Sequence, residues 1–475
     1  MRTSPSYTAS YRLEIDESTL SIAQIVDAVS STGAQIKGLD VADSDRGHIV
    51  IDLTCDMRDS DHRREVRQIL DGLEGVHTSS VADQTFMAHV GGKIEVHPKV
   101  PLRNRDDLSR AYTPGVARVC TAIHDMPEKA HLLTMKANSV AVVSDGTAVL
   151  GLGDIGPEAA LPVMEGKAVL FKQFGDVDAW PVVLDTKDTE EIISIVKAIA
   201  PAYGGINLED ISAPRCFEIE ERLRAELDIP VFHDDQHGTA IVVLAALINA
   251  LKLVNKKIED VRIVVSGVGA AGSAIIKLLL AQGARDIVGY GRTGALAGDD
   301  VEGMHPSRAW LAQNTNPRMV HGSLKEGIAD ADVFIGVSHG NILEPSDIAK
   351  MAPGAIVFAL ANPTPEVDPI AAAEYAAIVA TGRSDYPNQI NNVLAFPGLF
   401  RGLLDAKVKE ITTEVLRVAA NAIADVISPD ELSPNYIIPG VFNEAVPSAV
   451  SKAVRQAVHD LPTIDIPVQE HMDAR

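Results

Sequence analysis

The chain has 475 residues, of which 46% are hydrophobic and 23% charged, an ordinary composition for globular domains. At about 100–200 residues per domain, this length predicts two to four domains. The composition excludes a disordered, collagen-like or coiled-coil protein. Acidic residues outnumber basic ones by 65 to 42, so the net charge of −23 argues against nucleic acid or an anionic membrane as a partner.

The cysteines and the apolar segments indicate a reducing, aqueous compartment. Cys55, Cys120 and Cys216 are too few and too scattered for a disulfide framework or a zinc site, so we expect three reduced, buried residues. The N-terminus has no apolar signal core. The longest apolar stretch, residues 240–250, is interrupted by Asn249 and predicts a buried helix instead of a membrane span. We therefore expect a cytoplasmic protein.

Residues 1–86 predict a small α+β domain of their own. Apolar periodicity predicts the order β-α-β-β-α-β over residues 7–15, 18–31, 34–41, 48–57, 59–73 and 75–86. This order is typical of a ferredoxin-like fold, with both helices on one face of an antiparallel sheet. No catalytic cluster is present, so structural, dimerising and regulatory roles stay open. The order, with Gly33 after the first helix, resembles ACT domains, which implies a binding site for a small-molecule effector.

Beyond Gly91 the pattern changes to alternating strands and helices, which is typical of doubly wound parallel α/β sheets. We assign residues 87–250 to a substrate- and metal-binding domain. Residues 251–475 are assigned to a Rossmann dinucleotide-binding domain with additional C-terminal helices.

Two residues of the first α/β domain are candidates for proton transfer. Lys167 lies on the apolar face of a predicted helix over residues 159–174. Burial there would lower its pKa and suit a general base, although most lysines are ordinary surface residues. Tyr112 precedes a predicted helix start at residues 113–116. It either points into a cleft as a proton donor or packs on the first helical turn.

Two predicted strands, over residues 205–208 and 229–232, end in acidic residues. The acids are Glu209 and Asp210 after the first strand, and Asp234 and Asp235 after His233 in the second. If the strands are parallel neighbours, these carboxylates converge at one edge, which requires a cation or protons to neutralise them. Oxygen ligands favour Mg or Mn over zinc. The alternative is that each acid caps a helix or pairs with a base.

A dinucleotide signature follows the predicted strand over residues 261–266. The signature is Gly267-Val268-Gly269-Ala270-Ala271-Gly272, followed by a predicted helix over residues 273–282. In this context the glycines allow a tight turn and close approach of a pyrophosphate, which the helix N-terminus attracts. Ser338 and Asn362 follow later strands, where an open α/β sheet binds its ligand.

The next strand gives an indication of the cofactor. It ends in Gly291-Arg292, without the acid that would accept the ribose 2′-hydroxyl of NAD. Arg292 is able to pair with a 2′-phosphate, which favours NADP over NAD. The alternative is that Arg292 is a solvated surface residue and NAD binds without the acid.

Seven ordered blocks resemble bacterial malic enzymes from about Gly91 to the C-terminal helix. The blocks lie at residues 105–117, 144–156, 164–167, 207–210, 233–239, 359–363 and 389–393. The resemblance implies a malic-enzyme-like substrate domain followed by a Rossmann domain. It also implies the oxidative decarboxylation of (S)-malate to pyruvate and CO2, with reduction of NAD(P) and a requirement for Mg or Mn.

The resemblance also implies roles for individual residues. It makes Tyr112 the acid and Lys167 the base, and it places Asp234 beside the metal or in the proton network. The implied metal ligands are Glu209, Asp210 and Asp235, and the implied substrate ligands are Asn362, Asn391 and Asn392. One departure is clear: residues 145–150 lack the arginine with which animal relatives hold the substrate carboxylate.

Two other functions are alternatives to that of a malic enzyme. A metal-independent hydroxyacid or amino-acid dehydrogenase would use a lysine base without decarboxylation, and chelation would leave it active. A ligand-sensing binding protein would have no use for the acid, base and metal residues together. In the malic enzyme reading, we expect malate as the small-molecule substrate and a homodimer or larger homo-oligomer.

Overall fold

A computed structural model of the chain describes residues 3–45, 47–149, 151–299 and 301–459. The chain divides into two units, Met1–Val96 and His97–Arg475, and each is described by itself.

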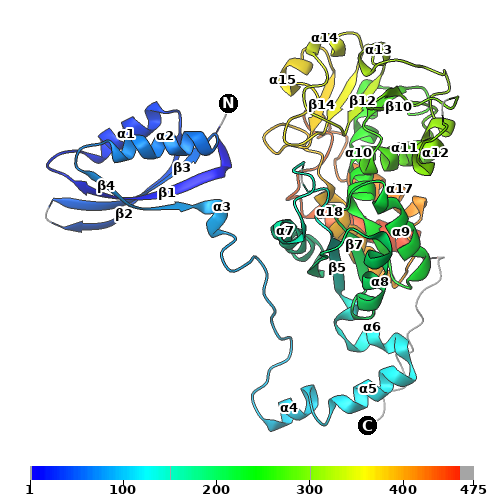
Figure 1. The fold of residues 1–475 in the computed structure, drawn as a ribbon, viewed down its shortest axis with the longest axis horizontal. Coiled ribbons are helices and arrows are strands. Elements are labelled where there is room, and N and C mark those ends of the chain that lie inside the picture. The colour runs from blue at the N-terminus through cyan, green and yellow to red at the C-terminus, as the bar shows by residue number, and fades with distance from the viewer. Residues whose placement is uncertain (1–2, 46, 150, 300, 460–475) are drawn as a thin grey trace. The chain divides into compact units, whose positions relative to one another are not determined.

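Unit 1 contains the predicted β-α-β-β-α-β order. Its elements are β1 (Ser4–Asp16), α1 (Ile22–Ser31), β2 (Gln35–Asp45), β3 (His48–Met57), α2 (Ser60–Asp71), β4 (Val76–Asp83) and the single turn α3 (Gln84–Met87). The strands form an antiparallel sheet in the order β2-β3-β1-β4. Helices α1 and α2 lie on one face of this sheet and enclose its apolar core (Figure 1).

Two ends of these elements differ from the prediction. Helix α1 begins at Ile22 after the cap residue Ser21, because Ser18 instead donates its hydroxyl and backbone N–H to the Asp16 side chain. The last strand ends at Asp83, whose carboxylate accepts the backbone N–H groups that start α3.

The first part of unit 2 is a parallel sheet in the order β6-β5-β7-β8. Its elements are β5 (Ser139–Ser144), α7 (Pro157–Gly175), β6 (Asp178–Val183), α8 (Thr189–Ile199), β7 (Gly205–Leu208), α9 (Arg215–Glu226) and β8 (Val231–His233). Helices α8 and α9 pack on one another, while α7 packs against β5 and β6. Because the strands are parallel, the segments that follow β7 and β8 meet at one edge.

Helix α10 (Asp234–Val254) follows β8 directly and runs through residue 250, the predicted domain boundary. It is the one helix in the described ranges that is long and apolar enough to cross a membrane. Most of its residues are buried, and it packs against α11 and α17 within the main core of unit 2. The prediction of a buried helix around residues 240–250 is therefore confirmed.

The second sheet of unit 2 has the order β11-β10-β9-β12-β13-β14. Its strands are β9 (Arg262–Ser266), β10 (Asp286–Gly291), β11 (Gly294–Ala295), β12 (Val333–Gly336), β13 (Ile356–Ala359) and β14 (Ile378–Thr381). All neighbours are parallel except β10 and β11. The chain moves outward from β9 to β10 and then returns to β12, so the strand order reverses beside β9, where such sheets bind ligands.

The helices of this second sheet include α11 (Ala270–Gln282), α12 (Pro306–Asn314) and three short ones, α13 (Leu324–Gly327), α14 (Pro345–Ile348) and α15 (Pro369–Ala372). The C-terminal helices are α16 (Phe396–Ala406), α17 (Thr413–Ala424) and α18 (Ala445–Ala457). Of these, α16 packs on α7 and α17 packs on α10, so the C-terminal segment covers elements of both sheets.

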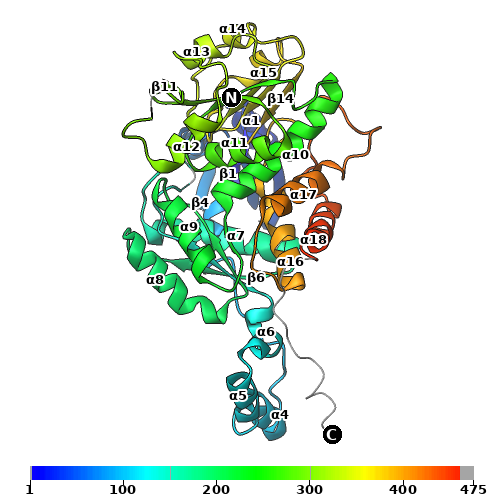
Figure 2. The ribbon, with the colours of Figure 1, turned by 90° about the vertical axis from the view of Figure 1, so that its right-hand side faces the viewer.

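An arm precedes the first sheet of unit 2. It consists of α4 (Arg105–Ala111), α5 (Val116–Asp125) and the single turn α6 (Ala130–Leu133). Figures 1 and 2 both show α4 and α5 projecting away from the sheets of unit 2. Helix α5 has no buried residue, so Cys120 is exposed, and the prediction that all three cysteines are buried is wrong for it. Cys55 and Cys216 are buried, and all three are unpaired thiols.

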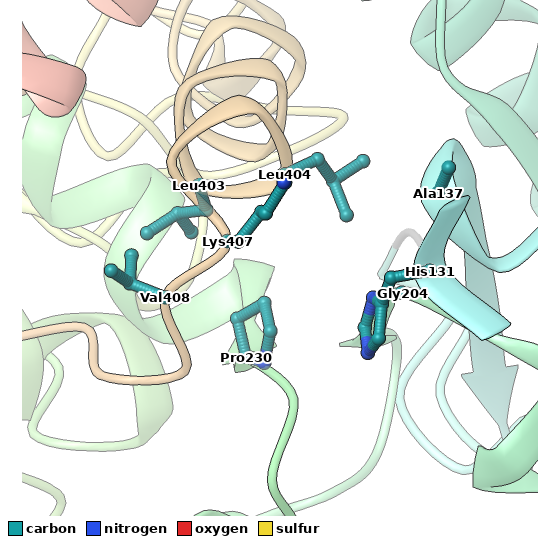
Figure 3. A pocket seen from close by; sticks show the side chains of 8 residues that line it. All are labelled: His131, Ala137, Gly204, Pro230, Leu403, Leu404, Lys407 and Val408. Atoms are coloured by element: carbon teal, nitrogen blue, oxygen red, sulfur yellow. The ribbon is translucent and has the colours of Figure 1, made fainter. Parts of the chain in front are cut away.

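A cavity of about 60 Å³ lies near α6, lined by His131, Pro230 and Lys407 among others (Figure 3). It is much smaller than the pockets of about 300–1,000 Å³ that hold small ligands. None of the predicted site residues lines it.

Candidate active site

Three carboxylates converge at the edge where β7 and β8 end. Glu209 and Asp210 follow β7, and Asp235 lies in the first turn of α10. One oxygen from each of the three lies within 4.8 Å of the others. The backbone of Asp210 has a φ of 53°, a left-handed conformation that non-glycine residues seldom adopt. The structure thus brings together the three acids that the sequence suggested as metal ligands.

Helix α10 begins at Asp234, directly after β8. Asp234 and Asp235 therefore occupy its first turn, where free N–H groups and the helix dipole favour negative charge. Gly238 makes room for this arrangement, since a Cβ atom there would lie 1.9 Å from Asp234 Oδ1.

Lys167 extends from α7 into this cluster and is only 6% exposed. Its Nζ donates to Asp234 Oδ2 at 2.5 Å and lies 2.8 Å from Glu209 Oε1. The ammonium group also lies 4.2 Å from the centre of the Phe396 ring. The predicted buried lysine is confirmed, and it contacts the carboxylate cluster directly.

The electrostatics of Lys167 differ from the prediction. Burial by itself lowers its pKa, but the carboxylates of Asp234 and Glu209 outweigh this effect and raise the pKa above the ordinary value. The prediction of a lowered pKa is therefore wrong for this arrangement. Apolar periodicity revealed the burial of the amine, but it gave no sign of the two carboxylates that contact it.

The acids of the cluster have perturbed pKa values. Burial, followed by the charge of Asp235, raises the pKa of Asp210 to about 7. Burial also raises the pKa of Glu209. The Oδ2 atom of Asp210 is buried and has no hydrogen-bond partner among the described residues. An orphaned carboxylate oxygen beside two other acids fits a hard divalent cation, which prefers oxygen ligands.

A chain of buried polar groups behind Asp235 was missed by the sequence analysis. Glu220 on α9 accepts from Gln236 Nε2 at 2.9 Å, and that amide lies 2.8 Å from His233 Nδ1. The Nε2 atom of His233 lies 3.2 Å from Asp235 Oδ2 without the geometry of a hydrogen bond. This buried chain therefore places the imidazole of His233 beside Asp235, in the position that outer partners of metal ligands commonly take. A glutamate in the middle of an amphipathic helix gives no sequence signal for this role.

The two asparagines of the block at residues 389–393 behave differently. Asn392 donates to Asp234 Oδ2 and so joins the cluster directly. Asn391 uses its Oδ1 atom to accept from Val393 N at 3.0 Å, which caps the short helix η4 (Asn392–Leu394).

Ser338 and Asn362 lie at the carboxyl edge of the second sheet, as predicted. The fully buried carboxylate of Glu366 accepts from the backbone N–H groups of Ser338 and Ala361, at 2.9 and 3.0 Å. It thereby ties together the segments that follow β12 and β13. Asn362 also meets the loop of the first sheet, since a Cβ atom on Gly151 would lie 2.7 Å from the Asn362 carbonyl oxygen.

The glycine-rich turn has the geometry that a dinucleotide requires. Gly267 has a φ of 97°, and a Cβ atom on Gly272 would lie 1.7 Å from the Gly267 carbonyl oxygen. A Cβ atom on Gly269 would meet no atom within 4 Å, so this backbone faces open space. Helix α11 begins at the next residues, Ala270 and Ala271, without a side-chain cap. Its free N–H groups fit a pyrophosphate.

Arg215 contacts the loop that follows β5, where the sequence has no arginine of its own. Its Nη2 donates to Asp145 Oδ2 at 2.8 Å and to Thr147 Oγ1 at 3.1 Å, within the loop that follows β5. Because this guanidinium is already paired with a buried carboxylate, it holds the loop in place.

Two predicted residues lie apart from these groups. Tyr112 is 67% exposed and lies on the arm, at the end of α4. It does not precede a helix start directly, because α5 begins only at Val116. Arg292 is exposed after β10 and forms no hydrogen bond or ion pair within the described part of the chain.

Two protein-family models match the part of the chain that contains these groups. The family model of the malic enzyme N-terminal domain matches residues 91–224, and that of the malic enzyme NAD-binding domain matches residues 236–460. The chain belongs to the malic enzyme family. Neither match includes residues 1–90, so the likeness of unit 1 to ACT domains stays a prediction.

Individual malic enzymes are similar over most of the chain. The chain is 58% identical to the NAD-dependent malic enzyme of Geobacillus stearothermophilus over 94% of both proteins. It is 43% identical to the NADP-dependent malic enzyme of Escherichia coli K12, over 80% of this chain and 52% of that protein. A solved structure of the NAD-dependent malic enzyme from Thermotoga maritima is 51% identical, with a TM-score of 0.76, and covers 79% of this chain and 99% of that one. Similar malic enzymes are thus named for either cofactor.

Proposed function

We propose that the chain oxidises malate and decarboxylates the product to pyruvate and CO2 at the cluster around Lys167, with reduction of NADP. The observation that carries this assignment is the buried Lys167 ammonium group, in contact with both Glu209 and Asp234. A base, a set of hard-cation ligands and a dinucleotide turn belong to one folded unit. A metal-independent dehydrogenase would have no use for the acidic cluster.

Glu209, Asp210 and Asp235 would hold the divalent cation. When bound, the cation supplies Lewis-acid polarisation of the substrate oxygens. Lys167 Nζ would take the proton of the 2-hydroxyl group, and a dinucleotide bound at the glycine-rich turn would supply the hydride acceptor. Lys167 must lose a proton before it is able to act as a base. Asp234, which accepts a hydrogen bond from the amine, is the group that takes this proton. After CO2 leaves, the Lys167 ammonium group stabilises the enolate, and Tyr112 delivers a proton to C3.

We propose that Tyr112 of one copy of the chain reaches the site around Lys167 of a second copy. It is exposed on an arm that projects from the sheets of unit 2 in both views (Figures 1 and 2). The segment containing the arm also exposes other large apolar side chains: Val100, Leu102, Leu108, Leu132, Leu133 and Met135. Apolar surface of this extent is typical of an interface. The proposed assembly is a homodimer or larger oligomer in which each arm completes the partner's site.

The metal assignment is tested by direct binding of Mn²⁺, measured by electron paramagnetic resonance. We expect Asp235→Asn to weaken Mn²⁺ binding by at least about tenfold, because a ligand carboxylate is lost. Asp228→Asn is the control, since Asp228 is exposed before β8 and pairs with Lys409 at the surface. Equal Mn²⁺ affinity in all three proteins would contradict the assignment.

NADP is the proposed preferred cofactor because β10 ends at Gly291 and is followed by Arg292, without an acid. The ribose 2′-hydroxyl of NAD lacks its usual carboxylate partner there, whereas an arginine suits a 2′-phosphate.

Unit 1 is proposed to bind a small-molecule effector. It has an apolar core of its own, and its residues 1–90 lie outside both family matches. Removal of residues 1–86 is expected to leave malate turnover measurable while abolishing the response of the rate to amino acids and organic acids. Unchanged effector response and unchanged oligomeric mass after this deletion would contradict a regulatory role.

A further inference from the structure

The guanidinium group of Arg308 lies at the carboxyl end of β10. Arg308 belongs to α12, and its Nη2 would lie 2.3 Å from a Cβ atom on Gly291. The same Cβ position is 3.5 Å from Val268 Cγ2, within the glycine-rich turn. The end of this strand beside this turn is where Rossmann domains bind the ribose of the adenosine half. Arg308 therefore stands where a ribose 2′-substituent would lie.

The guanidinium group of Arg308 forms few polar contacts with the described residues. Its Nη2 has one long contact, 3.4 Å from Thr293 Oγ1, and its Nε is buried without a hydrogen-bond partner. No carboxylate of the described residues pairs with it. An unsatisfied buried donor is costly, and a charged one more so. In a chain with a net charge of −23, a guanidinium without an acidic partner at a ligand-binding edge indicates an anionic ligand.

We propose that Arg308 binds the 2′-phosphate of NADP, together with Arg292, and that Gly291 is the residue that permits it. A Cβ atom at position 291 would force the Nη2 group of Arg308 to move from its present position. An aspartate there would pair with Arg308 and remove its charge from the site. A planar guanidinium matches a phosphate bidentately, which gives a strong and specific contact. This inference rests on the proposed use of NADP and adds the residue that recognises its 2′-phosphate.

The test is isothermal titration calorimetry of the full chain with 2′,5′-ADP and with 5′-AMP, which lacks the 2′-phosphate. Arg308→Ala is expected to weaken 2′,5′-ADP binding by at least about tenfold, the usual effect of losing a charged hydrogen bond. The affinity for 5′-AMP is expected to change far less. Arg285→Ala is the matched control, because Arg285 is an exposed arginine next to the opposite end of β10.

A second variant keeps the test independent of the stability of Arg308→Ala. Gly291→Asp is expected to lower the ratio of the 2′,5′-ADP affinity to the 5′-AMP affinity, as Arg308→Ala does. Equal affinity of the wild type for both nucleotides, or an unchanged ratio in Arg308→Ala, would overturn the proposal. Failure of the malic enzyme assignment itself would show separately, as an absence of malate-dependent pyruvate with either NADP or NAD.

Discussion

Lys167→Arg is expected to lower the rate of malate oxidation by about 10²–10⁴-fold while preserving the fold. Arginine keeps a positive charge against Asp234 and Glu209, so the two buried carboxylates stay paired. Its guanidinium does not release a proton at accessible pH and therefore cannot act as the base. The measurement is kcat for malate at saturating cofactor and Mn²⁺, with circular dichroism to verify the fold.

Lys172→Arg provides the control, because Lys172 lies on the same helix and pairs with exposed or half-buried acids at its end. Near-normal turnover by Lys167→Arg would contradict the assignment of the base. Lys167→Ala is a less clean variant, since removing one partner of a buried ion pair costs about 3–5 kcal/mol of stability. We expect that loss to appear in urea unfolding of Lys167→Ala and not in that of Lys167→Arg.

Mixed oligomers of Tyr112→Phe and Lys167→Arg are expected to regain activity that neither variant has alone. If the arm of one copy completes the site of the other, a mixed dimer holds one site with both Tyr112 and Lys167 intact and one site with neither. Random assembly makes about half of the dimers mixed, so about a quarter of wild-type activity should return. The measurement is pyruvate formation after the two variants are co-expressed or dissociated and reassembled together.

The control for this experiment is the double variant Tyr112→Phe/Lys167→Arg assembled with the wild type. In that mixed dimer each site holds one intact residue of the pair, so the mixed species contributes no active site. If Tyr112 instead serves the Lys167 of its own chain, the two single variants would not complement each other. In that case the double variant would leave half of the sites of each mixed dimer active.

The parts of the site that follow strand ends could be predicted from the sequence. Glu209 and Asp210 follow a short apolar strand, and parallel pairing brings the ends of neighbouring strands to one edge. The glycine-rich turn was equally predictable, because the positive φ of Gly267 and the close packing of Gly272 restrict these positions to glycine. In both cases a local pattern determines the local geometry.

The remaining parts depend on tertiary contacts that local patterns do not contain. The pKa of Lys167 is set by two carboxylates from other elements, so burial alone predicted the wrong direction. Glu220 and Arg308 belong to other elements than the residues that they approach, Gln236 and Gly291. The exposure of Tyr112 follows from the placement of the whole arm, which no local pattern around this residue predicts.

The most direct test of the account is a rate measurement with L-malate and Mn²⁺, comparing NADP with NAD and assaying pyruvate together with the reduced cofactor. We expect pyruvate and NADPH to form in equal amounts and NADP to support the faster rate. Both products should disappear on chelation and return with Mn²⁺. Reduced cofactor without pyruvate, or turnover that survives chelation, would contradict the central claim.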